Sequence, residues 1–428
     1  MQLKISAVAL SVAAAFALSA CGQKEEPKIA APVPAAAPQV PEAVVKIGHV
    51  APMTGPQAHL GKDNENGARL AIEELNAQAI EIGGAKIKFE LLGEDDQADP
   101  KQGTTVAQKL VDAKVNGVIG HLNSGTTIPA SKLYSDAGIP QISGSATNPT
   151  YTQQGFKTAF RVMANDVQQG KVLGEFAVKQ GAKSVAVVDD RTAYGQGLAD
   201  EFRKAAEAAG LKVVANEYTN DKATDFKAIL TKIKSKKPDL IFFGGMDAQG
   251  GPLVKQMAEL GIKAKFLGGD GVCTPEFMKL GGAAAEGQYC SLPGQPLEKL
   301  AKGPAFKEKF TKKFNAEIQL YAPYVYDAVM VMADAMKRAG SADPAKYLPE
   351  LGKTNYDGVT AMIGFDQFGD LQGGAISLYQ YKAGKLDYVE TLGGAAAAPA
   401  AAPAAEAAKA EAAPAPAAAT APAPADKK

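Results

Sequence analysis

Two short turns of small polar residues carry the side chains of this sequence that are best suited to binding. The first reads Asn-Ser-Gly-Thr-Thr over 123–127, and the second reads Ser-Ala-Thr-Asn-Pro over 145–149. Serine and threonine hydroxyls, together with the unpaired backbone N–H groups at the start of a helix, can hold a small anion such as a carboxylate. The same residue types are also ordinary helix N-caps, so the turns alone leave both interpretations open.

Each turn follows a short apolar segment that is typical of a buried strand. Val118 and Ile119 precede the first turn, residues 139–143 lead to the second, and a helix is expected between them over 130–137. In such a strand–helix–strand unit both turns lie at the carboxyl ends of parallel strands, where open α/β sheets bind ligands. We therefore expect the segment 117–149 to hold the centre of a binding site.

This segment also carries a family resemblance. The runs IGHLNSGTTIPASKLY and IPQISGSATNP resemble the periplasmic binding proteins for branched-chain amino acids (leucine, isoleucine and valine) that serve ABC importers. The likeness extends from about residue 44 to about residue 392 and includes the blocks VVDDRTAYGQGLADEF, DLIFFGGMDAQGG and FLGGDGV. So many blocks in the same order make the resemblance specific, although each block alone would be weak.

The resemblance implies a role for five polar candidates. By correspondence, Ser124 and Thr147 meet the ligand's carboxylate, and a backbone carbonyl at Ser145 accepts from its ammonium group. Tyr194 reaches the ligand from a second lobe, and Asp270 balances the ammonium charge. The best-known relatives have glutamate at the last position, so the shorter aspartate requires closer lobes or a bridging water. An ordinary turn aspartate and a half-buried tyrosine are the alternatives.

Ala146, between Ser145 and Thr147, is a further ligand-binding candidate, and the candidates expected around the ligand's side chain are Leu60, Leu122, Asn123, Met246 and Tyr321. Leu60 and Met246 stand where the relatives carry tyrosines. An aliphatic wall still suits a branched side chain, because methylene groups require only shape and dryness. Adaptable methionine and polar Asn123 would widen the range of ligands. Leucine and methionine at these positions are equally compatible with plain core packing.

The middle of the chain alternates strand and helix patterns, which favours an α/β fold with doubly wound parallel sheets. Strands are expected over 45–50, 87–92, 184–188, 211–215, 240–243 and 376–381, and further helices over 66–78, 199–209 and 225–234. The resemblance adds the topology of the type I periplasmic binding proteins, two lobes joined by a three-crossing hinge. By correspondence, lobe 1 is 44–164 plus 294–369, and lobe 2 is 165–293 plus 370–392.

The two ends of the chain differ from its middle. Residues 1–20 read as a lipoprotein signal peptide, because Lys4 precedes an apolar run over 5–18 that is too short to span a bilayer. The following Leu-Ser-Ala-Cys resembles a lipobox, in which Cys21 is lipidated; a plain cleaved signal is the alternative. The Ala/Pro-rich stretches 21–43 and 393–428 are expected to be a flexible tether and a disordered tail.

Cys273 and Cys290 are the remaining cysteines. An even pair in an exported chain favours a disulfide, with a buried pair of free thiols as the alternative.

Composition and motifs limit the classes of function. Lys+Arg and Asp+Glu both number 46, so there is no basic excess for nucleic acid or an anionic membrane. No G-x-S-x-G, P-loop or G-x-G-x-x-G motif opens a strand–helix junction, and the three histidines are too scattered in the sequence for a metal motif. We therefore expect no enzyme, no cofactor and no metal.

The predicted function is that of a monomeric, periplasmic, lipid-anchored substrate-binding protein of an ABC importer. It would capture leucine, isoleucine or valine by hinge closure and deliver them to the permease subunits. An amino-acid or amide sensor that feeds a separate signalling partner is the alternative.

Overall fold

The computed structural model describes residues 40–394. The predicted signal peptide, Cys21, almost all of the tether and almost all of the C-terminal tail lie outside the described residues. Within that range, no helix combines the length and the apolar character needed to cross a membrane.

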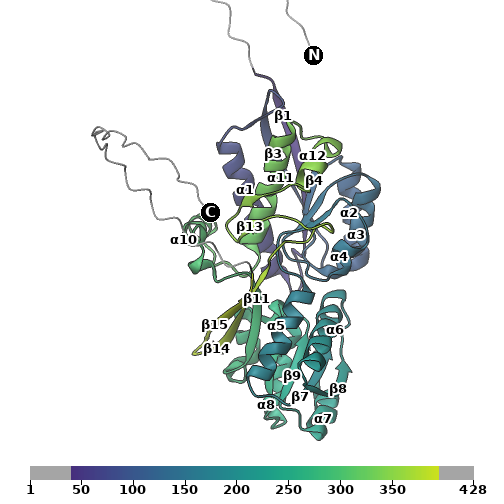
Figure 1. Ribbon diagram of the computed structural model, residues 1–428, viewed down its shortest axis with the longest axis vertical. Coiled ribbons are helices and arrows are strands. Elements are labelled where there is room, and N and C mark those ends of the chain that lie inside the picture. Colours follow the sequence, from purple (N-terminus) through teal and green to yellow (C-terminus); the bar gives the residue numbers. More distant parts are fainter. Residues whose placement is uncertain (1–39, 395–428) are drawn as a thin grey trace, which may run out of the picture. The chain divides into compact units, whose positions relative to one another are not determined.

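The first sheet has six strands in the order β2-β3-β1-β4-β5-β6, and all neighbours are parallel except β2 and β3. Figure 1 shows α1 and α11 on one side of its central strands and α2 and α3 on the other. The strands are β1 (Glu42–Ala51), β2 (Glu81–Ile82), β3 (Ala85–Asp95), β4 (Gly117–Gly120), β5 (Gln141–Ser143) and β6 (Ala159–Arg161). The helices of this part are α1 (Ala58–Ala77), α2 (Pro100–Asp112), α3 (Ser124–Asp136), α4 (Thr150–Gln153), α10 (Gly303–Phe314), α11 (Ala322–Ala339) and α12 (Pro344–Leu351).

The second sheet has seven strands in the order β15-β14-β11-β10-β9-β7-β8, of which β14 and β15 are antiparallel to their neighbours. The strands are β7 (Ser184–Asp189), β8 (Lys212–Tyr218), β9 (Leu240–Gly244), β10 (Lys265–Gly268), β11 (Tyr289–Pro293), β14 (Ala375–Lys382) and β15 (Lys385–Gly393). Its helices are α5 (Asp166–Lys179), α6 (Ala193–Ala208), α7 (Lys227–Lys236), α8 (Asp247–Glu259) and α9 (Pro275–Gly281). A short hairpin of β12 (Tyr356–Asp357) and β13 (Met362–Ile363) completes the strands.

The two faces of the second sheet show why its central strands β7 and β9 carry continuous apolar runs. Val185 and Val187 of β7 belong to the hydrophobic cluster that contains the buried sides of α5 and α6. Ala186 and Val188 belong to the cluster that contains α7, α8 and α9. Because successive side chains of a strand point to opposite faces, a sheet covered on both faces requires a continuous apolar run. The six predicted strands are confirmed.

Three predicted helices begin earlier than the sequence indicated, and the one expected over 130–137 begins at Ser124 as α3. Helix α1 begins at Ala58 instead of residue 66, and α6 begins at Ala193 instead of residue 199, where the Thr192 side chain accepts from the Gly195 N–H at 2.9 Å. The first turns of these helices are rich in glycine and polar residues, so they lack the apolar period that marks a helix. At the other end of α1, Ala79 lies beyond the helix and is exposed, with φ of 47°.

The chain passes from the first sheet to the second after β6, returns after β11, and passes to the second sheet again before β14. A buried ion pair joins the first and third of these passages, between the Arg161 guanidinium and the Asp370 carboxylate. The Asn165 side-chain amide and the Thr152 hydroxyl also donate to Asp370, each at 3.0 Å. The first and third crossings are thus tied by charge and hydrogen bonds.

The disulfide between Cys273 and Cys290 is present, with a Cα–Cα distance of 5.3 Å. It joins the short 3₁₀ turn η1 (Asp270–Val272), which follows β10, to the neighbouring strand β11.

Candidate functional site

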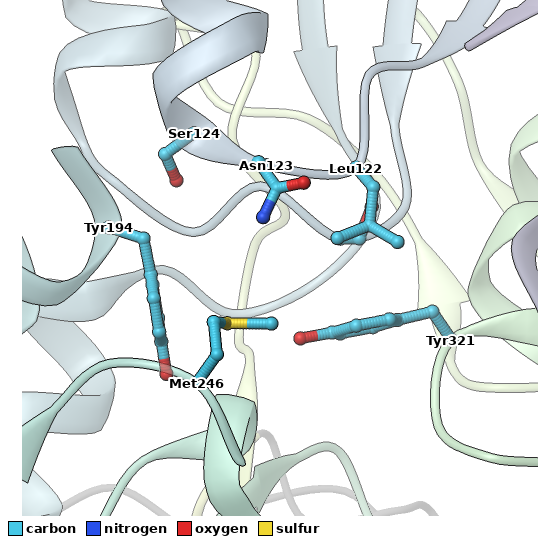
Figure 2. Close-up of a pocket in the computed structure, with 7 residues that line it drawn as sticks. Leu122, Asn123, Ser124, Tyr194, Met246 and Tyr321 are labelled. Atoms are coloured by element: carbon cyan, nitrogen blue, oxygen red, sulfur yellow. The ribbon is translucent and has the colours of Figure 1, made fainter. Parts of the chain in front are cut away.

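Seven of the predicted ligand-binding residues line one small pocket. Figure 2 shows Leu122, Asn123 and Ser124 on one side of it and Tyr194 and Met246 on the other, with their side chains turned toward one another. The complete lining is Leu122, Asn123, Ser124, Ser145, Tyr194, Met246 and Tyr321. Residues that are far apart in the sequence therefore meet in one small space.

The first side of the pocket is built by the two polar turns. Ile119 of β4 pairs with Ile142 of β5 in parallel register, so both strands end at the same edge of the sheet. The Ser124 hydroxyl accepts from the Asn148 backbone N–H at 3.2 Å, which joins the turns directly. Asn123 is the N-cap of α3, but its side chain makes no capping hydrogen bond. The Thr126 and Thr127 N–H groups donate to the Asn123 backbone carbonyl, but no cap side chain serves the first turn of α3.

The opposite side comes from three neighbouring strands of the second sheet. Tyr194 lies in the first turn of α6 after β7, Met246 precedes α8 after β9, and Asp270 follows β10. These strands are parallel and adjacent, so their carboxyl ends meet at one edge. The pocket therefore lies between the carboxyl edges of both sheets, the position at which α/β sheets bind ligands.

Asp270 is buried behind two tyrosines and does not line the pocket surface. The Tyr194 hydroxyl donates to its Oδ1 at 2.9 Å, and the Tyr321 hydroxyl donates to its Oδ2 at 2.7 Å. Burial raises the pKa of Asp270, and the two tyrosine hydrogen bonds oppose that rise. A buried carboxyl requires hydrogen-bond donors, and tyrosines from both sides of the pocket supply them.

Asp63 of α1 fixes the position of Tyr321. Its buried carboxylate accepts four backbone hydrogen bonds, from residues 319 to 322, and the bond from the Tyr321 N–H is 2.7 Å long. These groups lie at the start of α11, where backbone donors lack helical partners. The ring that reaches Asp270 is therefore held from the first sheet's side.

Unpaired polar atoms lie beside the pocket. Among the described residues, the Thr147 hydroxyl and the Asn123 side-chain oxygen are buried without hydrogen-bond partners, and so are both carboxyl oxygens of Asp166. The Asp166 backbone N–H donates to the Thr147 carbonyl at 2.9 Å, so the two residues adjoin. Burial raises the pKa of Asp166 to about 8, and the negative charge of Asp270 adds to this rise. Such groups favour a ligand that carries both donors and charge.

Four predicted residues are buried but do not line the pocket: Leu60, Ala146, Thr147 and Asp270. Leu60 belongs to the hydrophobic cluster that also contains Leu122, Met246 and Tyr321.

Sequence reasoning missed two residues that support the pocket. The Gln57 side chain accepts from the Asn123 amide at 2.7 Å, and the Asn64 amide donates to the Ser145 hydroxyl at 3.1 Å. Gln57 is the N-cap of α1, and Asn64 lies about two turns further along the helix. Their spacing of seven residues places them on one face of a helix, which an earlier start for the predicted helix would have revealed.

His121 does not belong to the pocket. Its ring is buried between the Asp96 carboxylate and the Tyr134 hydroxyl, each at 3.0 Å.

Comparison with known proteins now adds to this geometry. The Periplasmic binding protein family matches residues 44–385. The chain belongs to this family. Leu/Ile/Val-binding protein homolog 1 of Brucella abortus (strain 2308) is 39% identical over 354 residues, which cover 81% of this chain and 93% of that protein. A Pseudomonas aeruginosa relative, named leucine-, isoleucine-, valine-, threonine- and alanine-binding protein, is 36% identical over 338 residues, covering 79% of this chain and 90% of its own.

Solved structures confirm the predicted type I fold of this periplasmic binding protein. A leucine binding protein from Thermotoga maritima superposes with a TM-score of 0.76 at 29% identity, covering 81% of this chain and 98% of its own. A branched-chain amino acid transporter substrate binding protein from Streptococcus pneumoniae, in complex with isoleucine, gives 0.74 at 30% identity, covering 82% and 100%. The relatives are named as binding proteins, in agreement with the prediction of a non-enzymatic role.

Proposed function

We propose that this chain is the extracytoplasmic substrate-binding protein of an ABC importer and captures branched-chain aliphatic L-amino acids for delivery to a permease. The pocket between the carboxyl edges of the two sheets carries this proposal. Its hydroxyl-bearing helix start at Ser124 suits a carboxylate, and Leu122 and Met246 suit an aliphatic side chain. The buried acid behind the tyrosines suits an ammonium group.

Each polar group then has a partner on the ligand. Ser124 and the first N–H groups of α3 hold the carboxylate, while Thr147 and the Ser145 carbonyl complete the polar end. Asp270 supplies the counter-charge for the ammonium group. The Tyr194 and Tyr321 hydroxyls either bridge the ammonium group and Asp270 by hydrogen bonds or move aside so that the two charged groups touch. Full pairing is required, because a free amino acid loses its hydration in such a pocket. Closure takes place between lobe 1 (44–164 plus 294–369) and lobe 2 (165–293 plus 370–392).

Calorimetry with L-leucine, L-isoleucine and L-valine tests the function, with D-leucine, L-lysine and L-glutamate as controls. We expect the three branched L-amino acids to bind and the controls to bind weakly or not at all. The thermal midpoint should rise as well, because a ligand at a hundred times its Kd stabilises the folded state by about 2.7 kcal/mol. Ligand recovered unchanged from the complex agrees with binding alone. Selective binding of a charged or aromatic compound instead would contradict the proposal.

The membrane anchor is a separate part of the proposal. The Leu-Ser-Ala-Cys sequence supports a mature chain that begins at a diacylglycerol-bearing Cys21. Mass spectrometry of the membrane fraction should find this modification, and Cys21→Ser should release the chain into the soluble fraction. An added amide-linked acyl chain should make release of the parent slow, because several chains hold a protein far better than one. An unmodified N-terminus in the membrane-bound parent would refute the anchor.

A further inference from the structure

A direct contact between two polar side chains joins the two sides of the pocket. His59 lies in the first turn of α1, directly before Leu60, and Asp247 is the first residue of α8, directly after pocket-lining Met246. The His59 Nε2 and the Asp247 Oδ2 are 2.9 Å apart. Helix α1 packs on the first sheet, and α8 packs within the hydrophobic cluster of the second sheet. Hinge opening would therefore separate these two groups.

The two partners differ in their contact with solvent. The Asp247 side chain is fully buried, whereas 24% of the His59 side chain is exposed. The Thr274 hydroxyl also donates to Asp247 Oδ2, at 2.6 Å, and holds the carboxylate in place. Asp247 Oδ1 is buried without a partner in the described part of the chain. The carboxylate is thus a fixed, desolvated acceptor, and the histidine ring covers it from the solvent side.

The charges around the His59 ring come from two helices of the opposite side. Asp247 of α8 faces it directly and Glu276 of α9 adds a second negative charge, while the Pro56 backbone on its own side also favours the charged ring. Burial alone would oppose protonation, but the hydrogen bond and charge of Asp247 outweigh it and raise the pKa of His59. The contact is therefore strongest when the ring is charged.

We propose that His59 and Asp247 form a pH-sensitive latch that holds the two lobes closed over the ligand, so that ligand leaves more slowly as the pH falls. The proposal rests on the proposed binding function, and His59 acts in it as a positioning residue that need not touch the ligand. In the open form the His59 ring no longer contacts Asp247, so the pKa of His59 returns toward its ordinary value. Protons therefore bind the closed form more tightly and favour it.

The direction of the pH effect follows from this difference. Stabilisation of the closed form is fully present below the pKa of the open form, near 6.5, and is lost as the pH rises through the higher pKa of the closed form. Each unit of difference between the two pKa values changes the closed-to-open ratio by up to about tenfold. We therefore expect L-leucine to dissociate about three to ten times more slowly at pH 5.5 than at pH 8.

Stopped-flow dissociation of L-leucine from the parent and from His59→Gln tests the latch. Glutamine keeps a neutral donor near Asp247 but does not titrate, so the dissociation rate of His59→Gln should depend much less on pH than that of the parent. An equal pH dependence in the parent and in His59→Gln would overturn the latch while leaving the binding function intact. Asp247→Asn, checked for folding by circular dichroism, should reduce the pH dependence in the same way.

A second measurement is independent of any ligand. Spin labels on cysteines introduced at Lys132 of α3 and Lys204 of α6, both largely exposed, report the distance between the lobes in the purified chain. The closed population should be larger at pH 5.5 than at pH 8 in the parent and insensitive to pH in His59→Gln. This result without leucine binding would support the latch and reject the proposed ligand. Distances that are independent of pH in the parent would reject the latch.

Discussion

Asp270→Ala should lower the affinity for leucine more than a hundredfold. The carboxyl is buried and accepts hydrogen bonds from tyrosines on both sides of the pocket. Its removal leaves the ligand's ammonium group without a counter-charge, at a cost of about 3–5 kcal/mol. It also leaves the Tyr194 and Tyr321 hydroxyls without their buried acceptor, which weakens the contact that joins the two lobes.

Two matched variants identify the cause of this loss. Asp270→Asn keeps an acceptor for one tyrosine but removes the charge, so it should bind nearly as poorly as Asp270→Ala. Ser124→Ala removes one hydroxyl while the backbone N–H remains, so a loss of about 1–2 kcal/mol is expected. Circular dichroism first shows that each of the three variants is folded. Titration calorimetry then gives the order of their affinities for leucine.

The order of the affinities decides between two roles for the acid. If Asp270→Asn binds leucine as well as the parent does, the acid acts by positioning the tyrosines and not by its charge. If Asp270→Ala also binds as well as the parent, the ammonium site lies elsewhere, and Asp166 becomes the next buried acid to test.

Cys290→Ala should lower the free energy of unfolding by about 3 kcal/mol, because its disulfide closes a 17-residue separation and restricts the unfolded chain. Guanidinium unfolding of the oxidised parent and of the variant measures the difference. The double variant Cys273→Ala/Cys290→Ala should lose no more than a small further amount, since either single change already removes the bridge. Parent protein treated with a reductant is the matched control.

Cys290→Ala should also lower the affinity for leucine, but less than Asp270→Ala does. Cys273 directly follows the 3₁₀ turn that begins at Asp270, and the bridge ties this turn to β11. A turn that moves more freely positions the carboxyl less well for the tyrosines. Non-reducing peptide mapping that finds both thiols free in periplasmic material would show that the bridge does not form in the cell.

The local sequence was sufficient to predict the architecture around the site. Apolar runs such as 240–243 mark strands covered on both faces, and the polar turns at 123–127 and 145–149 mark their carboxyl ends. Because the two strands of a strand–helix–strand unit are parallel, their carboxyl ends place both turns at one edge of the sheet. The structure confirms that they touch, through Ser124 and the Asn148 N–H. Cysteine count and export similarly favoured the Cys273–Cys290 bridge, which is present.

Tertiary structure alone decided how the two sides of the pocket meet. The hydrogen bond from Tyr321 to Asp270 and the contact of His59 with Asp247 join residues from different sheets. Their geometry depends on the angle between the lobes and on side-chain rotamers, and no periodic pattern encodes either. The early start of α1 was missed for a related reason: its first turns face a polar site instead of an apolar core. Hydrophobic periodicity detects helices that are buried against an apolar core. It therefore does not mark the turns of a helix that face a ligand site.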